Sequence, residues 1–387
     1  MKKTLKTSLL RTLVLGTLSI SAALYGCGGG GSSSAPSAAA GTGGATVNGS
    51  SGGTAGTSTG SPGNTGGETA NGSTGCTPTL AAAESIALFP ADNPWNSDIS
   101  QAAVDARSAA IMALLAQSTS SGIFTDFGSG TYYGAPIGIP YRVVCGDQPK
   151  VPVVYRANGY DGNYGSESDP GPFPIPLDAP IEGNGVGDSH VITVDVQNKK
   201  LYELYNASLE AGGTAWGASS GALFDLSSNA LRPMCHTSAD AAGLPIFAGL
   251  VRYEEVAGGT IDHALRFTLP KSVVSPSFTA PARHRVFGSN TDPATPVPMG
   301  MRLRLKSAVD ISGYSKTNQV ILTAMKRHGI ILADIGSSFY LSGAPDARWN
   351  NDDLRRLRAI KPSDFEVVQM GTIVDPSLPA DRMLCAP

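Results

Sequence analysis

Alternating hydrophobic and polar positions predict a β-hairpin over the run GDSHVITVDVQNKKLYELYNA, from Gly187 to Ala207. Two alternating runs flank a polar turn at 197–200, which is typical of paired antiparallel strands. We expect Val196 to lie opposite Leu201 across the turn. A period of two then places seven side chains on one face: His190, Ile192, Val194, Val196, Leu201, Glu203 and Tyr205. A carboxyl group on such an apolar face requires a structural or a functional reason.

Short hydrophobic runs along the rest of the chain predict further strands and few helices. The strands are expected over 139–144, 151–155, 222–226, 246–256, 263–269 and 300–306. Helical spacing of apolar residues predicts helices over 101–117, 316–328 and 351–360. This pattern favours a mainly β domain with a β-sandwich-like core and a few peripheral helices. The alternative is an α+β fold in which the C-terminal third packs against one sheet.

The N-terminus predicts export and attachment to a membrane. Residues 1–26 combine four basic residues, an apolar stretch and a small residue before Cys27, as a signal peptide does. The run LYGC at 24–27 resembles the lipobox of bacterial lipoproteins, which implies lipidation of Cys27. Gly28 in place of aspartate favours, by the same resemblance, a lipid anchor in the Gram-negative outer membrane, facing the periplasm or the medium. An ordinary secretory signal is the alternative.

Composition then divides the rest of the chain into a tether and one domain. Residues 27–75 begin with the lipidated cysteine and continue almost wholly as Gly, Ser, Thr and Ala, which cannot bury enough apolar surface to fold. No second low-complexity linker divides 76–387, so we expect a single globular domain there. Without the signal, 24 basic residues stand against 31 acidic ones, a net charge of −7. This charge argues against nucleic acid as a partner.

The cysteines predict two disulfides. Once Cys27 is lipidated, an even number remains in an exported chain. We expect Cys76 to pair with Cys385, joining the ends of the domain, and Cys145 to pair with Cys235. A metal thiolate site is disfavoured because the chain has no C-x-x-C spacing.

Glu203 and Asp225 are the candidate acid/base pair. Glycosidases use two carboxyl groups, one protonated and one ionised, and burial raises the pKa of a carboxyl toward the protonated form. The structural alternative has Glu203 hydrogen-bonded near a rim and Asp225 capping the turn that follows it. Four further residues are candidates for substrate binding or, alternatively, for the core and for ion pairs: Tyr205, Trp216, Arg232 and Asp240.

Histidines supply a second candidate chemistry. His190 and His263 each begin an apolar strand face and are expected to orient a sugar or assist proton transfer. Together with His284 they are also candidate ligands of a transition metal. The competing interpretation is that each is a core histidine with satisfied nitrogens.

A loop rich in oxygen ligands is a candidate calcium site. Asp161, Asn163, Glu167 and Asp169 alternate with glycines. The spacing departs from that of an EF-hand, so an acidic surface loop is the simpler interpretation.

Several runs resemble a family of exported bacterial proteins whose activity is uncharacterised. They include FPADNPWNSDIS, SDPGPFPIPLDAPIEG, the hairpin at 187–205, IDHALRFTLP and ILADIGSSFYLSGAPDARW. The resemblance extends from about Phe89 to Val368 and implies one integrated domain, but it transfers no catalytic residues. The letters GDS at 187–189 also occur in GDSL-type hydrolases, although here they precede a strand instead of following one. No H-E-x-x-H or Walker motif is present.

The sequence therefore predicts an exported, membrane-anchored protein that acts on extracellular polysaccharide by acid/base hydrolysis. A glycan-binding or adhesion lipoprotein without turnover is the first alternative. A histidine-ligated metalloprotein, with calcium or a transition metal as its cofactor, is the second.

Overall fold

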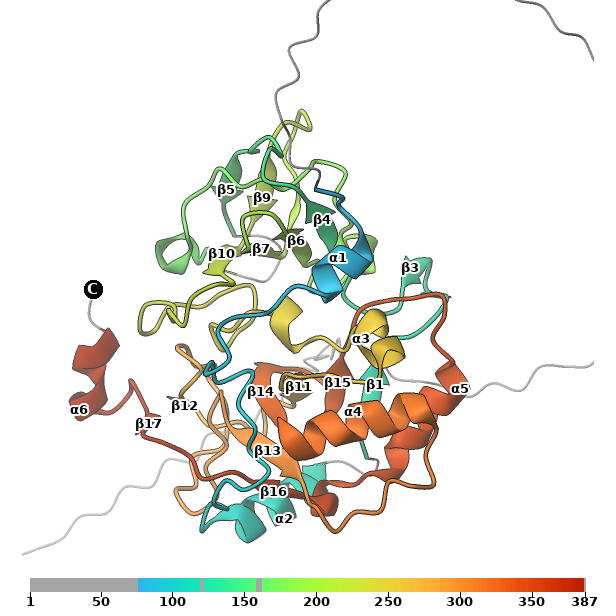
Figure 1. Cartoon of the computed structure of the whole chain (residues 1–387). Coiled ribbons are helices and arrows are strands. Elements are labelled where there is room, and N and C mark those ends of the chain that lie inside the picture. The colour runs from blue at the N-terminus through green and yellow to red at the C-terminus, as the bar shows by residue number, and fades with distance from the viewer. Residues whose placement is uncertain (1–75, 119–121, 158–161, 386–387) are drawn as a thin grey trace, which may run out of the picture. The chain divides into compact units, whose positions relative to one another are not determined.

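A computed structural model describes residues 76–118, 122–157 and 162–385 (Figure 1). The predicted signal peptide, the lipidation site Cys27 and the tether lie outside these residues. Within them, no helix has the length and apolar character needed to cross a bilayer.

The largest sheet has six strands and mixes parallel with antiparallel pairs. Its order is β1 (Phe124–Asp126), β15 (Tyr340–Ser342), β11 (Leu265–Leu269), β14 (Ile330–Ile335), β13 (Arg302–Leu305) and β16 (Phe365–Val367). Strands β1 and β15 are parallel, as are β11 and β14, and the other neighbours are antiparallel. The sheet lies in the lower half of Figure 1.

The four-stranded and the three-stranded sheet lie in the upper half of Figure 1. The four-stranded sheet has the order β10 (Ser220–Asp225), β7 (Lys200–Tyr205), β6 (Val191–Asp195) and β4 (Arg142–Val144). A three-stranded sheet contains β5 (Val153–Tyr155), β9 (Trp216–Ala218) and β8 (Ser208–Leu209). Two further pairs are β2 (Thr131–Tyr132) with β3 (Ala135–Pro136), and β12 (Phe278–Thr279) with β17 (Ile373–Val374). The predicted mainly β domain with few helices is confirmed.

Six α-helices are described, and the two longest pack on strands β16 and β13 of the six-stranded sheet. They are α1 (Leu80–Glu84), α2 (Ser108–Ser118), α3 (Tyr253–Gly258), α4 (Lys316–Arg327), α5 (Asn351–Leu354) and α6 (Pro379–Arg382). Helix α4 begins where the Ser315 hydroxyl accepts a hydrogen bond from the Asn318 N–H at 3.1 Å. It ends before Gly329, whose φ of +73° suits glycine. Its buried Ile321, Leu322 and Met325 recur at helical spacing on the side that packs on β13.

The central hairpin forms, but its register differs from the prediction by two residues. Val194 lies opposite Leu201, and Ile192 lies opposite Glu203. The turn closes early because the Asp195 carboxylate accepts hydrogen bonds from the N–H groups of Gln197 and Asn198, at 3.1 and 2.9 Å. A shift by an even number of residues leaves every side chain on its predicted face.

The strand predicted over 246–256 is wrong. The segment instead forms a 3-10 helix over Phe247–Gly249 and then α3. The N–H groups of Ile246 and Phe247 both bind the Glu203 carboxylate, which turns the backbone away from an extended path. The helix predicted over 101–117 begins only at Ser108.

The two disulfides join Cys76 with Cys145 and Cys235 with Cys385, so the predicted pairing was wrong. Helix α1 packs on β4, which brings the start of the domain to Cys145 at the end of that strand. The chain end returns beside β12 through β17, and the Cys235 N–H donates to the carbonyl of Arg283 nearby. Tertiary packing therefore selected the partners.

Candidate functional site

The predicted proton donor, Glu203, is sealed inside the domain. Its side chain is 0 % exposed, and its two oxygens accept hydrogen bonds from the N–H groups of Ile246 and Phe247 at 3.0 and 2.9 Å. Burial raises the pKa of Glu203 to about 7, as expected for a desolvated carboxyl. Because no solvent reaches it, Glu203 cannot contact a polysaccharide and instead fixes the backbone at 246–247.

The predicted partner, Asp225, lies on the opposite face of the same sheet. Glu203 is opposite Ala222, and the side chain three residues further along a strand points to the other face. Asp225 pairs with Lys200 at 2.7 Å and accepts a hydrogen bond from the Ser227 N–H, and these contacts lower its pKa to about 2. The structure thus contradicts the Glu203–Asp225 pair and favours the turn-capping alternative for Asp225.

The four predicted substrate-binding residues do not form one surface. Trp216 is 0 % exposed and donates from Nε1 to the carbonyl of Ile175 at 3.2 Å, so it is a core residue. Tyr205 is half-buried, and the centroid of its ring lies 5.6 Å from the centroid of the His190 ring. Arg232 pairs with Asp169 at 2.5 Å, and not with Asp240.

The three histidines occupy separate environments. The His263 ring contacts Glu255 and Arg252, and its Nδ1 lies 2.7 Å from the carbonyl of Ala264. His284 Nδ1 lies 2.7 Å from the carbonyl of Ala241. Among the described residues, no three His, Cys, Asp or Glu side chains converge as metal ligands. The predicted three-histidine metal site is therefore not formed.

The candidate calcium loop uses its oxygens internally. Asp161 lies outside the described residues. Asn163 accepts a hydrogen bond from the Gly165 N–H at 2.8 Å, and Glu167 accepts one from the Thr237 N–H at 3.0 Å. Asp169 accepts from the Leu223 N–H at 2.7 Å and pairs with Arg232. These contacts fit an acidic loop that is attached to the domain.

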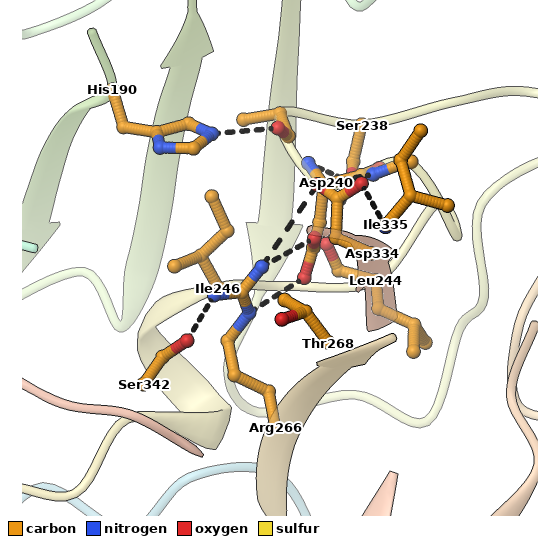
Figure 2. Close-up of polar contacts among 12 residues, drawn as sticks. His190, Ser238, Asp240, Leu244, Ile246, Arg266, Thr268, Asp334, Ile335 and Ser342 are labelled. Carbon is orange, nitrogen blue, oxygen red and sulfur yellow. Dashed lines mark hydrogen bonds and ion pairs between the residues drawn. The ribbon is translucent and has the colours of Figure 1, made fainter. Parts of the chain in front are cut away.

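A different set of charged residues converges on β11 (Figure 2). The Arg266 guanidinium binds both oxygens of Asp240, at 3.0 and 2.8 Å, and also donates to the Ser342 hydroxyl. The side chains of Arg266 and Asp240 are 4 % and 0 % exposed. Such a two-point contact fixes the orientation of both groups, which burial would otherwise destabilise.

Asp334 on β14 adds a second carboxyl group beside this pair. It lies 4.0 Å from the Arg266 guanidinium and accepts a hydrogen bond from the Ile335 N–H at 2.7 Å. Burial, and next the neighbouring Asp240 carboxylate, raise the pKa of Asp334 well above its usual value. Asp334 therefore holds its proton to a higher pH than an ordinary aspartate does.

Strand pairing places Asp126 on the same face of the sheet as Arg266. Asp126 of β1 pairs with Ser342 of β15, and the antiparallel register of β15 with β11 continues from Leu341–Phe267 to Ser342–Arg266. Residues directly opposite one another on adjacent strands share a face of the sheet. Asp126, Ser342 and Arg266 therefore lie side by side on one face.

Asp126 combines exposure with a raised pKa. The residue is exposed, yet desolvation by the surrounding protein raises the pKa of its carboxyl to about 6. The negative charges of Glu182 and Asp188 act in the same direction, and Arg266 opposes them. A carboxyl with these properties can hold a proton near neutral pH and still meet a substrate.

His190 keeps the Glu182 carboxyl ionised, in contrast to Asp126, whose pKa is raised. Its Oε2 lies 2.5 Å from His190 Nδ1 and also accepts a hydrogen bond from the His190 N–H at 3.3 Å. Burial alone would lower the pKa of His190, but the Glu182 carboxylate outweighs burial and raises it to about 9. Burial alone would raise the pKa of Glu182. The positive charge of His190 outweighs burial, so the pKa of Glu182 is lowered. His190 is thus an imidazolium whose Nε2 donates to the Ala239 carbonyl at 3.1 Å.

The candidate site therefore contains a carboxyl with a raised pKa, Asp126, that is coupled electrostatically to a carboxyl with a lowered pKa, Glu182. Neighbouring carboxyls whose pKa values are driven apart can serve as general acid and general base. His190 and Asp240 were among the candidates from the sequence, whereas Asp126, Glu182, Arg266 and Asp334 were not. The periodic pattern gives no signal for them, because three separate strands and a loop bring them together.

No protein-family model, curated protein or solved structure matches this chain.

Proposed function

We propose that this chain is an exported, lipid-anchored hydrolase of extracellular polysaccharide in which Asp126 and Glu182 are the acid/base pair. One observation carries the proposal, namely that two coupled carboxyls have pKa values displaced in opposite directions. Glycosidases use two carboxyl groups in different protonation states. One is protonated and assists the leaving group, and the other is ionised. The solvent access of Asp126 supports its assignment as the proton donor.

In the proposed reaction, Asp126 donates its proton to the glycosidic oxygen as the bond to the anomeric carbon breaks. Glu182 removes a proton from water or attacks the anomeric carbon itself. Both hydrogen bonds from His190 go to Oε2 of Glu182, so Oε1 is not engaged by that residue. The nearby carboxylates of Glu182 and Asp188 stabilise the positive charge that develops on the sugar ring.

His190 and Arg266 act as positioning residues in this proposal. His190 keeps Glu182 ionised, and Arg266 lowers the pKa of Asp126 against the two neighbouring carboxylates. Desolvation and the two carboxylates raise the pKa of Asp126, Arg266 opposes them, and the result is a pKa of about 6.

We also propose that Cys27 carries the lipid anchor in the outer membrane and that residues 28–75 tether the domain to it. The two disulfides of the domain support an oxidising compartment outside the cytoplasm. A glycan-binding lipoprotein without turnover is the second candidate, and the exposed Tyr132 and Tyr133 favour it because aromatic faces bind sugars whether or not a bond is cleaved.

The test compares Asp126→Asn and Glu182→Gln with the wild type in the release of reducing ends from soluble polysaccharides. Loss of general acid/base catalysis predicts a fall in kcat of roughly 100-fold or more for each variant. Asp225→Asn is the matched control, since that carboxylate lies on the four-stranded sheet, whereas Asp126 lies on the six-stranded sheet, and it pairs with Lys200. Full activity of Asp126→Asn excludes the assignment, and a wild type that binds polysaccharide without releasing ends supports the binding protein instead.

A further inference from the structure

Two exposed tyrosines form the tip of the β2–β3 hairpin. The residues Tyr132 and Tyr133 are 57 % and 93 % exposed. Their rings contact each other edge to face, with centroids 4.5 Å apart. An aromatic ring with this exposure adds almost nothing to the core, so packing does not account for Tyr133.

The hairpin borders the Asp126–Glu182 site on two sides. Asp126 ends β1, and the chain enters the hairpin only five residues later, at Thr131. On the other side, the Asn184 side-chain amide donates to the carbonyl of Gly134 at 3.1 Å, and Asn184 belongs to the same 3-10 turn as Glu182. The tyrosines are therefore attached to both segments that carry the proposed acid/base pair.

The backbone at the hairpin tip is unfavourable for tyrosine. The register pairs Tyr132 with Ala135, which leaves Tyr133 and Gly134 as a two-residue turn with φ of +48° and +84°. Turns of this kind favour Asn-Gly, because both central residues have positive φ. A bulky side chain at such a position is an outlier that points to a use other than folding.

We propose that Tyr133, with Tyr132 beside it, is a subsite that stacks against an uncharged sugar ring of the polysaccharide. The C–H faces of sugar rings pack well on aromatic faces. The carboxylates of Glu182 and Asp188 repel uronate and sulfate groups, so the ligand is a neutral glycan. The assignment as a substrate subsite rests on the proposed function, whereas binding itself does not.

The test is affinity gel electrophoresis of the full chain in gels that contain a neutral or an anionic polysaccharide. The neutral probes are hydroxyethyl cellulose, galactomannan, laminarin and soluble starch, and the anionic probes are alginate and polygalacturonate. We expect retardation by at least one neutral polysaccharide and by neither anionic one. Tyr133→Ala should weaken binding roughly 3- to 10-fold, the usual range for losing one aromatic stacking contact.

Phe287→Ala is the matched control, because this aromatic residue is 74 % exposed and its ring lies 5.0 Å from the Arg285 guanidinium, in a different segment. It should bind as the wild type does. Tyr133→Asn, which suits the turn, should fold and yet bind as weakly as Tyr133→Ala. This variant separates a binding role from a folding role.

The outcomes separate this inference from the proposed function. Unchanged binding and KM in Tyr133→Ala overturn the subsite, as does a wild type that binds no neutral probe or prefers the anionic ones. Binding that survives in Asp126→Asn, together with normal activity of that variant, overturns the acid/base pair and leaves the Tyr133 subsite intact. Weaker binding in both tyrosine variants, with normal binding in Phe287→Ala, supports the subsite.

Discussion

The Glu182 carboxylate accepts a hydrogen bond from Nδ1 of His190 at 2.5 Å, and each group sets the charge of the other. His190 is 2 % exposed, a position that would ordinarily leave an imidazole neutral. Its charge instead keeps Glu182 ionised beside Asp126.

The pair predicts a loss of stability at alkaline pH. The pKa of His190 rises from an ordinary value of about 6.5 to about 9 on folding, so the folded state binds more protons between these values. This contribution is complete below pH 6.5 and is lost as the pH rises through 9, with a magnitude on the order of 3 kcal/mol. Urea unfolding at pH 6 and pH 9.5 measures it. His190→Gln should lack this part of the pH dependence, and an unchanged profile in that variant would contradict the assignment.

Asp126 should titrate near pH 6, and activity should fall above that pH as the proton donor ionises. Carbon NMR of the side-chain carboxyls measures this pKa directly. Glu182→Gln removes a negative charge and should lower the pKa of Asp126 toward its ordinary value. Asp225→Asn should leave it unchanged, and equal shifts in the two variants would show that Glu182 is not the coupled partner.

The buried pair of Arg266 with Asp240 predicts a large cost when one partner is removed. Arg266→Ala leaves Asp240 buried without its cation, and this type of change costs roughly 3–5 kcal/mol in the free energy of unfolding. Lys200→Ala breaks a partly exposed pair with Asp225 and should cost less than about 1 kcal/mol. Urea unfolding of both variants checks the contrast, and similar losses would mean that burial does not set the difference.

Glu203→Gln should reduce stability without reducing catalysis. The carboxylate receives two backbone N–H donors, and a glutamine must turn its own NH₂ toward one of them, leaving an unmatched donor at a cost of about 1–3 kcal/mol. Thermal unfolding and reducing-end release at 25 °C measure the two effects. A loss of kcat in fully folded Glu203→Gln would return this residue to the catalytic assignment.

Tyr133→Asn should stabilise the domain by about 1 kcal/mol, because asparagine tolerates the positive φ that tyrosine does not. The midpoint of urea unfolding checks this value. Tyr132→Asn, at a strand position with no such requirement, is the control and should not gain stability. A Tyr133→Asn variant that loses stability would show that the tyrosine serves the fold.

Local pattern determined much of the secondary structure. Alternation placed His190, Ile192 and Glu203 on one face of the hairpin, and this grouping survived a register shift because the shift was even. The spacing of Ile321, Leu322 and Met325 located α4, with its end before Gly329. These features depend on neighbours within a few residues, so the sequence contains them directly.

The tertiary structure decided which cysteines pair and which residues form the candidate site. The cysteine pairs depended on which chain ends approach β4 and the segment at 235, and an even cysteine count does not encode that. The hydrogen bonds of Glu203 to 246–247 converted a predicted strand into helical turns. Above all, Asp126, Arg266 and Ser342 share a face only because β15 pairs with β1 and with β11, and the paired residues are more than seventy positions apart in the chain. Periodicity says which way a side chain points on its own strand, whereas only the register between distant strands says which side chain it meets.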